Sequence, residues 1–264
     1  MEALVVGAGP AGLMAASQLA AAGRRVVVVD AKPSVGRKFL MAGKSGLNLT
    51  KDESIDDFLS AYGTARDWLA PMLRAFGPVE VREWAEGLGQ EVFTGSSGRV
   101  FPKVMKTSPL LRNWMGALAV KDVEVRTRWR WTGWDGNALT FDTPDGVQTI
   151  APQVTILALG GASWARLGSD GKWAQFLDAP LAPFRPANMG FLREWSDFMK
   201  PHFGAPVKPV RLMVGEHSVK GEFVISARGI EGGAVYAISA MLRDGGEVAI
   251  DLMPDMALKD VIAK

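Results

Sequence analysis

An α/β fold built on a parallel sheet is the first prediction from this sequence, and three observations near its N-terminus carry it. Residues Ala3–Val6 form a short run of Ala, Leu and Val, which is typical of a buried parallel strand. A glycine turn, GAGPAG, follows, and LMAASQLAAAG then has the composition of a helix that stops at Gly23. A second apolar strand, RRVVVVD, ends on Asp30. Strand, helix and strand in this order predict a βαβ unit with parallel strands.

The glycine turn has the spacing GxGxxG, with an acidic residue at the end of the next strand. In such a unit Gly7 permits a tight turn, Gly9 lets the backbone approach a pyrophosphate, and Gly12 lets the helix pack close to the strand. The helix N-terminus attracts phosphate, and Asp30 can accept hydrogen bonds from ribose hydroxyls. A glycine turn without a ligand is the alternative. We predict a dinucleotide site formed by Gly7, Ala8, Gly9, Pro10, Ala11, Gly12, Asp30, Ala31 and Lys32.

The rest of the chain extends this pattern. A helix-rich excursion is predicted at about 51–120, in which Trp68, Trp84 and Trp114 fall on apolar faces and are expected in the core. DVEVRTR then predicts a third strand, and WRWTGWDGNALTFDTPDGVQTI predicts a three-stranded meander with turns at DGN and TPDG. The next apolar strand ends at Gly160 and Gly161.

Composition excludes several kinds of chemistry. The 264 residues include no cysteine, which excludes disulfides, thiol nucleophiles and cysteine-based zinc sites, so any redox chemistry needs a cofactor. Two histidines offer little for a triad or a metal site, and no metal is expected. The net charge of +2 and the scattered basic residues predict no nucleic-acid partner. The apolar N-terminal run has no basic residues before it and is interrupted by glycines, so we expect a cytoplasmic protein without a membrane partner.

Several local motifs, together with the order of elements, resemble one family of flavoproteins. The sequence is similar to the BaiN/RdsA family of FAD-dependent oxidoreductases, also described as YhiN-like or aminoacetone-oxidase-like. The motifs span most of the chain and are GAGPAGLMAA (7–16), GRKFLMAGKSGLNLT (36–50), GRVFP (98–102), LALGGASWARLGSDGKWA (157–174) and GEFVISARGIEGGAVYAIS (221–239).

This resemblance implies an organisation and a cofactor. It implies a Rossmann-like FAD-binding domain of glutathione-reductase type at 1–186, with a parallel sheet and a β-meander, and part of an inserted β-barrel-like domain at 187–264. FAD is the implied cofactor, with NAD(P)H as an electron donor and a small molecule as substrate. About a third of the family's length is expected to be missing after the last residue, as in a fragment or truncated product.

The resemblance also implies further cofactor contacts. They are Arg37, Lys38, Gly43, Lys44, Ser45, Asn48, Trp131, Gly160 and Gly161, with Arg228 as a candidate substrate contact. Lys44, Ser45, Gly46 and Leu47 replace the family's Gly-Gly-Arg-Cys, so the usual arginine of this loop is absent. Lys44 could supply the displaced charge, and Lys44→Ala should then weaken FAD binding.

Other functions stay open at this point. The GKS of residues 43–45 is similar to the end of an NTPase P-loop, but the first glycine of such a loop would fall at Lys38, and the loop follows the second strand instead of the first. An NTPase would hydrolyse ATP with Mg²⁺ and lose that activity in Lys44→Ala. A non-catalytic remnant that binds only the ADP moiety is the main alternative. The sequence specifies no substrate, catalytic residue or oligomeric state.

Overall fold

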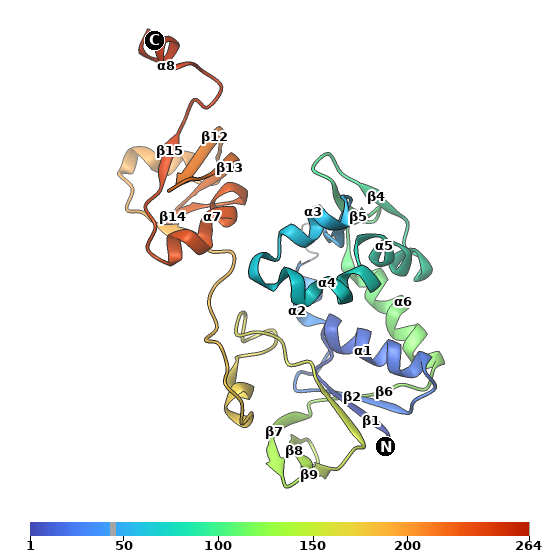
Figure 1. The fold of residues 1–264 in the computed structure, drawn as a ribbon. Coiled ribbons are helices and arrows are strands. Elements are labelled where there is room, and N and C mark those ends of the chain that lie inside the picture. The colour runs from blue at the N-terminus through green and yellow to red at the C-terminus, as the bar shows by residue number, and fades with distance from the viewer. Residues whose placement is uncertain (43–45, 264) are drawn as a thin grey trace. The chain divides into compact units, whose positions relative to one another are not determined.

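The computed structural model describes residues 1–42 and 46–263. The chain divides into two compact units, Met1–Ala182 and Pro183–Lys264, which are described separately (Figure 1). No helix in the described ranges is long and apolar enough to cross a membrane.

The first unit contains the predicted parallel sheet. Its four strands are β1 (Ala3–Val6), β2 (Val26–Asp30), β6 (Glu124–Thr127) and β10 (Val154–Leu157), in the order β10-β1-β2-β6. Each neighbouring pair is parallel, and Val6 lies opposite both Val29 and Leu157 in the registers of β1. The carboxyl ends of β1, β2 and β10 therefore meet at one edge of the sheet.

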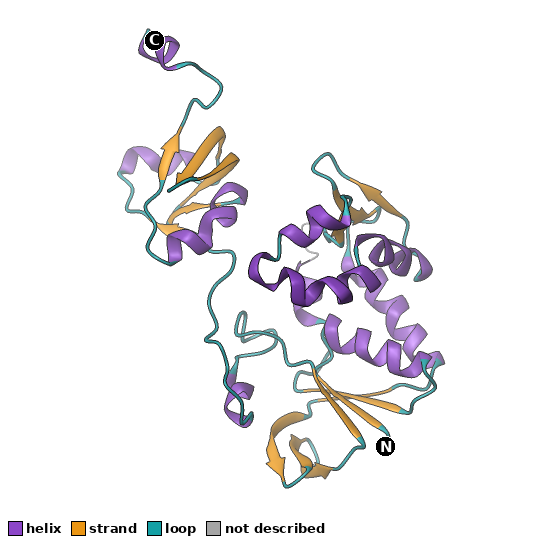
Figure 2. Ribbon diagram, in the orientation of Figure 1, coloured by secondary structure: helices purple, strands orange, loops and turns teal. Residues whose placement is uncertain are grey.

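Alternate residues of the sheet face two different layers. Ala3, Val5 and Val28 pack against helices α1 (Pro10–Ala21) and α6 (Thr107–Val120), which cover one face. Leu4, Val6, Val27 and Val29 face the antiparallel meander of β7 (Arg130–Asp135), β8 (Ala138–Thr143) and β9 (Gly146–Ile150). Figure 2 shows the helices on one side of the sheet and the meander on the other. Because strand residues alternate between faces, strands covered on both sides need unbroken apolar runs, as the central strands β1 and β2 have.

The excursion between β2 and β6 is helical, as predicted, and also contains a small sheet that was not predicted. Its helices are α2 (Arg37–Ala42), α3 (Ile55–Ser60), the 3-10 helix η1 (Gly63–Ala65), α4 (Arg66–Ala75), α5 (Pro78–Gly87) and α6. The sheet has the order β3-β5-β4 and consists of β3 (Thr50–Lys51), β5 (Arg99–Pro102) and β4 (Val92–Thr94). These strands are too short to produce a clear alternating pattern.

The prediction for the three tryptophans of the excursion is right for two and wrong for one. Trp114 is buried, and Trp84 packs edge-on against it with 4.7 Å between ring centroids. Trp68 is 70% exposed. It lies on α4, in which no residue is fully buried and Leu69 and Leu73 are half-buried, so the described residues cover the apolar face of this helix only in part. Apolar spacing shows that a helix has an apolar face, and only tertiary packing decides whether that face is covered.

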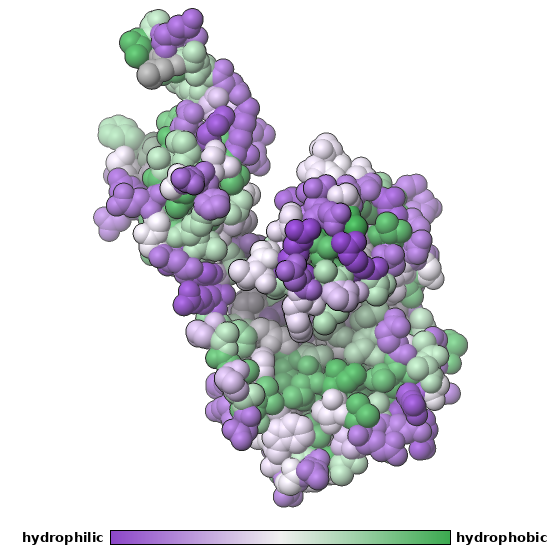
Figure 3. All heavy atoms as spheres, viewed as in Figure 1, coloured by the Kyte–Doolittle hydropathy of each residue, from purple (hydrophilic) through white to green (hydrophobic). Residues whose placement is uncertain are grey.

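The second unit is a five-stranded antiparallel sheet with one helix packed against it. The sheet order is β11-β14-β13-β12-β15, formed by β11 (Phe191–Leu192), β12 (Pro206–Val214), β13 (His217–Ser226), β14 (Gly229–Glu231) and β15 (Ala249–Asp251). Helix α7 (Gly233–Arg243) packs Ala234, Val235 and Ile238 against β12 and β13. The 3-10 helix η3 (Asp197–His202) precedes β12, and α8 (Leu258–Ile262) ends the described chain. Figure 3 shows, for the face in view, where apolar residues reach the surface.

Candidate dinucleotide-binding site

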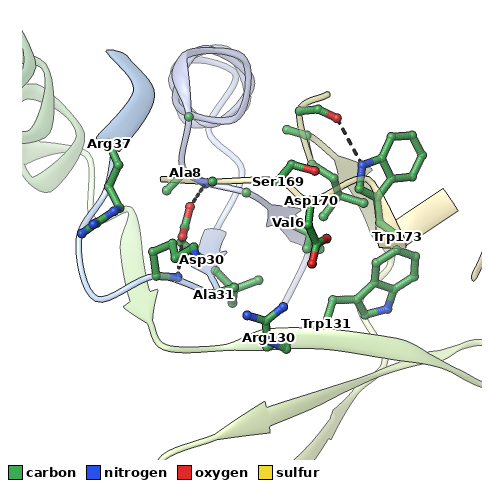
Figure 4. Close-up of a pocket in the computed structure, with 18 of the residues that line it drawn as sticks. Val6, Ala8, Asp30, Ala31, Arg37, Arg130, Trp131, Ser169, Asp170 and Trp173 are labelled. Carbon is green, nitrogen blue, oxygen red and sulfur yellow. Dashed lines mark hydrogen bonds between the residues drawn. The ribbon is translucent and has the colours of Figure 1, made fainter. Parts of the chain in front are cut away.

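A cavity of about 750 Å³ opens at the carboxyl ends of β1, β2 and β10. Its wall includes Val6 of β1 (Figure 4). Val29 of β2 and Ala158 just after β10 also line it. All of its lining residues belong to the first unit. The carboxyl edge of an open parallel sheet is where α/β proteins bind nucleotides.

The three glycines of the first turn have three different surroundings. Gly7 has a φ of +109°, and a Cβ there would lie 2.3 Å from the Ala158 carbonyl oxygen. A Cβ at Gly12 would lie 1.8 Å from the Gly7 carbonyl oxygen, so this position tolerates no side chain. Gly9 differs, because a Cβ there would meet no atom within 4 Å. Gly7 and Gly12 are thus required by packing, whereas Gly9 leaves open space at the cavity wall.

The N-terminus of α1 faces this space without a side-chain cap. Gly9 is the N-cap residue, Pro10 starts the helix, and no acidic side chain lies in the first turn. The first N–H groups of a helix have no partner within it and carry part of the positive end of the helix dipole. With Gly9 and Ala11 lining the cavity, this helix end is suited to bind an anion.

Asp30 joins the end of β2 to the glycine turn. Its carboxylate accepts one hydrogen bond from the Ala8 N–H, at 2.8 Å to Oδ2, and one from the Lys32 N–H, at 2.7 Å to Oδ1. These two bonds fix the carboxylate at the cavity wall, where Figure 4 shows it pointing toward Ala8. Each oxygen can accept a second bond, so the group can bind a pair of ribose hydroxyls.

Arg37 and Lys38 reach the same cavity from the start of α2. The Gly36 N–H donates to the Ala8 carbonyl at 2.9 Å, which holds this segment against the glycine turn. The Arg37 guanidinium donates to Ser34 Oγ at 3.2 Å, while its Nε is buried with no partner among the described residues. The Lys38 side chain lies against Gly168, where a Cβ would be 3.1 Å from Lys38 Cε. Two cations and one unpaired donor at the wall favour a phosphate-bearing ligand.

Of the other residues predicted to contact the cofactor or substrate, some line the cavity and some lie elsewhere. Ala31, Lys32, Trp131 and Gly160 line the cavity. Asn48 and Gly161 are exposed and outside the set that lines it. Arg228 belongs to the second unit, is exposed, and donates its own N–H to Ser226 Oγ. Gly43, Lys44 and Ser45 lie outside the described residues, so the predictions for this loop stay predictions.

The cavity also contains residues that the sequence did not single out. They are Arg130 of β7, Ser169 and Asp170 of the loop after β10, and Trp173 and Phe176 of the 3-10 helix η2 (Lys172–Phe176). Ser169, Asp170 and Trp173 belong to the motif GSDGKWA (168–174), which is the one sequence pattern that pointed to them. The same pattern is equally typical of a glycine turn before a helix. No cluster of acidic or histidine side chains suited to a metal occurs in the described ranges.

The fold and the glycine turn define the class: a Rossmann-type α/β unit with a dinucleotide cavity at its sheet edge. The model of the HI0933-like protein Rossmann domain matches residues 1–190, and that of the HI0933-like protein barrel and H2TH domain matches residues 185–264. The chain therefore belongs to the HI0933-like family, which is the BaiN/RdsA family of FAD-dependent oxidoreductases that the sequence motifs indicated.

Two curated proteins are similar to nearly the whole chain. Both are named ribosomal RNA dihydrouridine synthase: that of Haemophilus influenzae is 26% identical over 99% of this chain, and that of Escherichia coli is 23% identical over 98%. The chain spans 66% and 65% of their respective lengths. Both names refer to ribosomal RNA, and the expectation that this chain has no nucleic-acid partner stays a prediction.

Among solved structures, the chain is similar to the open conformation of a flavocytochrome c3 fumarate reductase. The sequence identity is 22%, the TM-score is 0.47, and the match covers 61% of this chain and 33% of the other.

Proposed function

We propose that this chain binds FAD and forms part of a flavin-dependent oxidoreductase. The observation that carries the proposal is the cavity at the carboxyl edge of the parallel sheet, where the open space at Gly9, the uncapped start of α1 and the carboxylate of Asp30 meet. Pyrophosphate fits the first two features, and a ribose diol fits the third.

The described residues fit this cofactor in charge as well as in shape. Arg37 and Lys38 add positive charge beside the helix N-terminus, and the buried Nε of Arg37 is a donor that phosphate would satisfy. Asp30 places a negative charge where a ribose with free hydroxyls binds and a ribose phosphate would be repelled. The flavin, when bound, supplies the electron-transfer chemistry that this cysteine-free chain lacks.

Membership of an oxidoreductase family supports a redox reaction. We propose a small molecule as the substrate, NAD(P)H as the electron donor and the cytoplasm as the location. The activity belongs to a longer protein in the relatives, because this chain spans about two thirds of their length. The substrate and the electron donor of this chain are therefore proposed and not carried over from the relatives.

Binding measurements test FAD against the alternative of a remnant that holds only ADP. We expect the purified chain to be yellow and to release FAD on denaturation. Calorimetry with FAD, ADP and NAD should give a much lower dissociation constant for FAD than for the other two. Similar weak affinities for all three would contradict the proposal and favour the remnant, and a colourless protein that cannot be reconstituted with FAD would do so as well.

The names of both curated relatives favour a second, narrower candidate. It is the reduction of a uracil base in ribosomal RNA to dihydrouracil, with electrons delivered through the flavin. The candidate rests on similarity over 98% or more of this chain.

This candidate is tested in the source cell by deleting the gene. Mass spectrometry of digested ribosomal RNA should show dihydrouridine in the parent strain and its loss at one position in the deletion strain. Restoration by the intact gene but not by an Asp30→Ala copy would connect the modification to the dinucleotide site. Unchanged dihydrouridine in the deletion strain would exclude the candidate without affecting the proposal of FAD binding.

A further inference from the structure

Helix α4 of the first unit carries an apolar stripe that is open to solvent. Trp68, Met72 and Ala75 follow one another at spacings of four and three residues, which places them on one side of the helix. Pro71 lies on the same side, and we call these four residues the α4 stripe. Each of them is exposed, with Trp68 at 70% and Met72 at 51%. Tryptophan and methionine together on one exposed face are typical of a surface that binds another protein.

The rest of α4 is held by the first unit. Leu69 and Leu73 are half-buried on another side of the helix, and α4 lies beside α3 (Figure 1). At the end of α4, a Cβ on Gly77 would lie 2.5 Å from the Leu73 carbonyl oxygen and 3.3 Å from Ile55 Cδ1 of α3. The helix is therefore fixed against its neighbours, and a partner can bind the stripe without first ordering it.

Two opposite charges border the stripe on the same flank. Asp67 and Arg74 are about two helical turns apart and lie on one side of the helix, Asp67 toward its start and Arg74 toward its end. Both are exposed. The Arg74 guanidinium donates to Asp56 Oδ1 at 3.0 Å and retains other N–H groups. The flank therefore carries one charge of each sign, one on either side of the middle of the stripe.

A second copy of the same chain fits this arrangement of charges. When two α4 helices pack antiparallel about a twofold axis, each flank faces the same flank of the other copy. Asp67 of one copy then faces Arg74 of the other, and symmetry produces this pair twice. A partner with a uniformly acidic or basic surface would instead meet a like charge at one end of the stripe.

We propose that the α4 stripe is the interface of a homodimer, in which α4 of one copy packs antiparallel on α4 of a second copy. Trp68 and Met72 form its apolar centre, and two pairs of Asp67 with Arg74 form its rim. The dimer does not depend on the cofactor, because none of the described residues of α4 lines the dinucleotide cavity. A helix of 10 residues is about 15 Å long, so the contact is smaller than a standard interface and the dissociation constant should be about 10 µM.

Sedimentation equilibrium of the full chain between about 1 and 100 µM tests for the dimer. The average mass should rise with concentration from that of one chain, 28.4 kDa, toward twice that value. Trp68→Ala should raise the dissociation constant by about tenfold or more, because a central tryptophan contributes a large share of the binding energy. Trp164→Ala removes another exposed tryptophan, outside α4, and is the matched control without effect. A wild-type chain that stays monomeric over this range would overturn the proposal.

Exchange of the two rim charges tests the antiparallel pairing. Asp67→Arg alone, or Arg74→Asp alone, brings like charges together at both ends of the interface and should weaken the dimer by about tenfold. The double variant, Asp67→Arg with Arg74→Asp, restores both pairs and should dimerise within about threefold of wild type. Circular dichroism checks that each variant is folded. A double variant that dimerises no better than the single variants would overturn the proposed arrangement.

Labelling of a single thiol distinguishes a second copy from cover by the same chain. The sequence contains no cysteine, so Met72→Cys introduces the only thiol. Its reaction with a maleimide should slow by about fourfold between about 1 and 100 µM protein, as the dimer forms. Val120→Cys, at an 85% exposed position on α6, is the matched control and should react at one rate throughout. Labelling of Met72→Cys that is slow at every concentration would show that the same chain covers the stripe, and labelling that is fast at every concentration would show that nothing does. Either result would overturn the dimer.

Discussion

At the scale of single residues, Gly9 and Gly12 lie three positions apart but are needed for different reasons: Gly12 for packing, and Gly9 for the approach of a ligand. Gly12→Ala would place a methyl group 1.8 Å from the Gly7 carbonyl oxygen, which forces α1 away from β1. We expect the free energy of unfolding of the first unit to fall by about 3 kcal/mol, the upper end for overpacking. Thermal unfolding followed by circular dichroism measures the loss.

Gly9→Ala is the matched substitution on the ligand side of the same turn. Gly9 has φ −82° and ψ −179°, which any residue can adopt, and its Cβ would meet nothing within 4 Å. The unfolding midpoint should therefore stay close to that of wild type. The new methyl group would occupy the space through which the pyrophosphate approaches the backbone, so the affinity for FAD should fall by about tenfold or more. A Gly9→Ala protein with wild-type affinity would show that no phosphate approaches this glycine.

At the scale of elements, a hydrogen bond between two helices joins the layer that covers the sheet. Trp114 on α6 is buried and its indole donates to Ser17 Oγ on α1 at 2.8 Å, and Ser17 Oγ donates to the Leu13 carbonyl. Ser17→Ala should cost about 1–3 kcal/mol of stability, because it leaves a buried indole N–H without a partner. In a Trp114→Phe background the same change should be nearly neutral, since no donor remains. A double-mutant cycle by urea unfolding measures the coupling, and equal costs in both backgrounds would contradict it.

The same elements show what sequence patterns can and cannot predict. Unbroken apolar strands and the GxGxxG turn predicted the parallel sheet, α1 and the position of Asp30, because burial on both faces and a tight turn each restrict the residue types. The sheet β3-β5-β4 was not predicted, because its strands span two to four residues and their pairing is tertiary. The end of the cavity beside the meander, which Arg130 and Asp170 line, was missed for a related reason. Arg130 and Asp170 lie 40 residues apart in sequence, and only the packing of η2 on β7 brings them to one space.

At the scale of the whole molecule, every residue that lines the cavity lies between Val6 and Phe176, within the first unit. That unit has its own sheet and hydrophobic clusters, so a protein of residues 1–182 should fold alone. We expect it to bind ADP with the same affinity as the full chain, by calorimetry under matched conditions. FAD then distinguishes two arrangements: equal affinity would place all contacts of the cofactor in the first unit, whereas weaker binding of FAD with unchanged binding of ADP would assign contacts with the flavin half to residues 183–264. Loss of ADP binding in a folded 1–182 protein would contradict the location of the site.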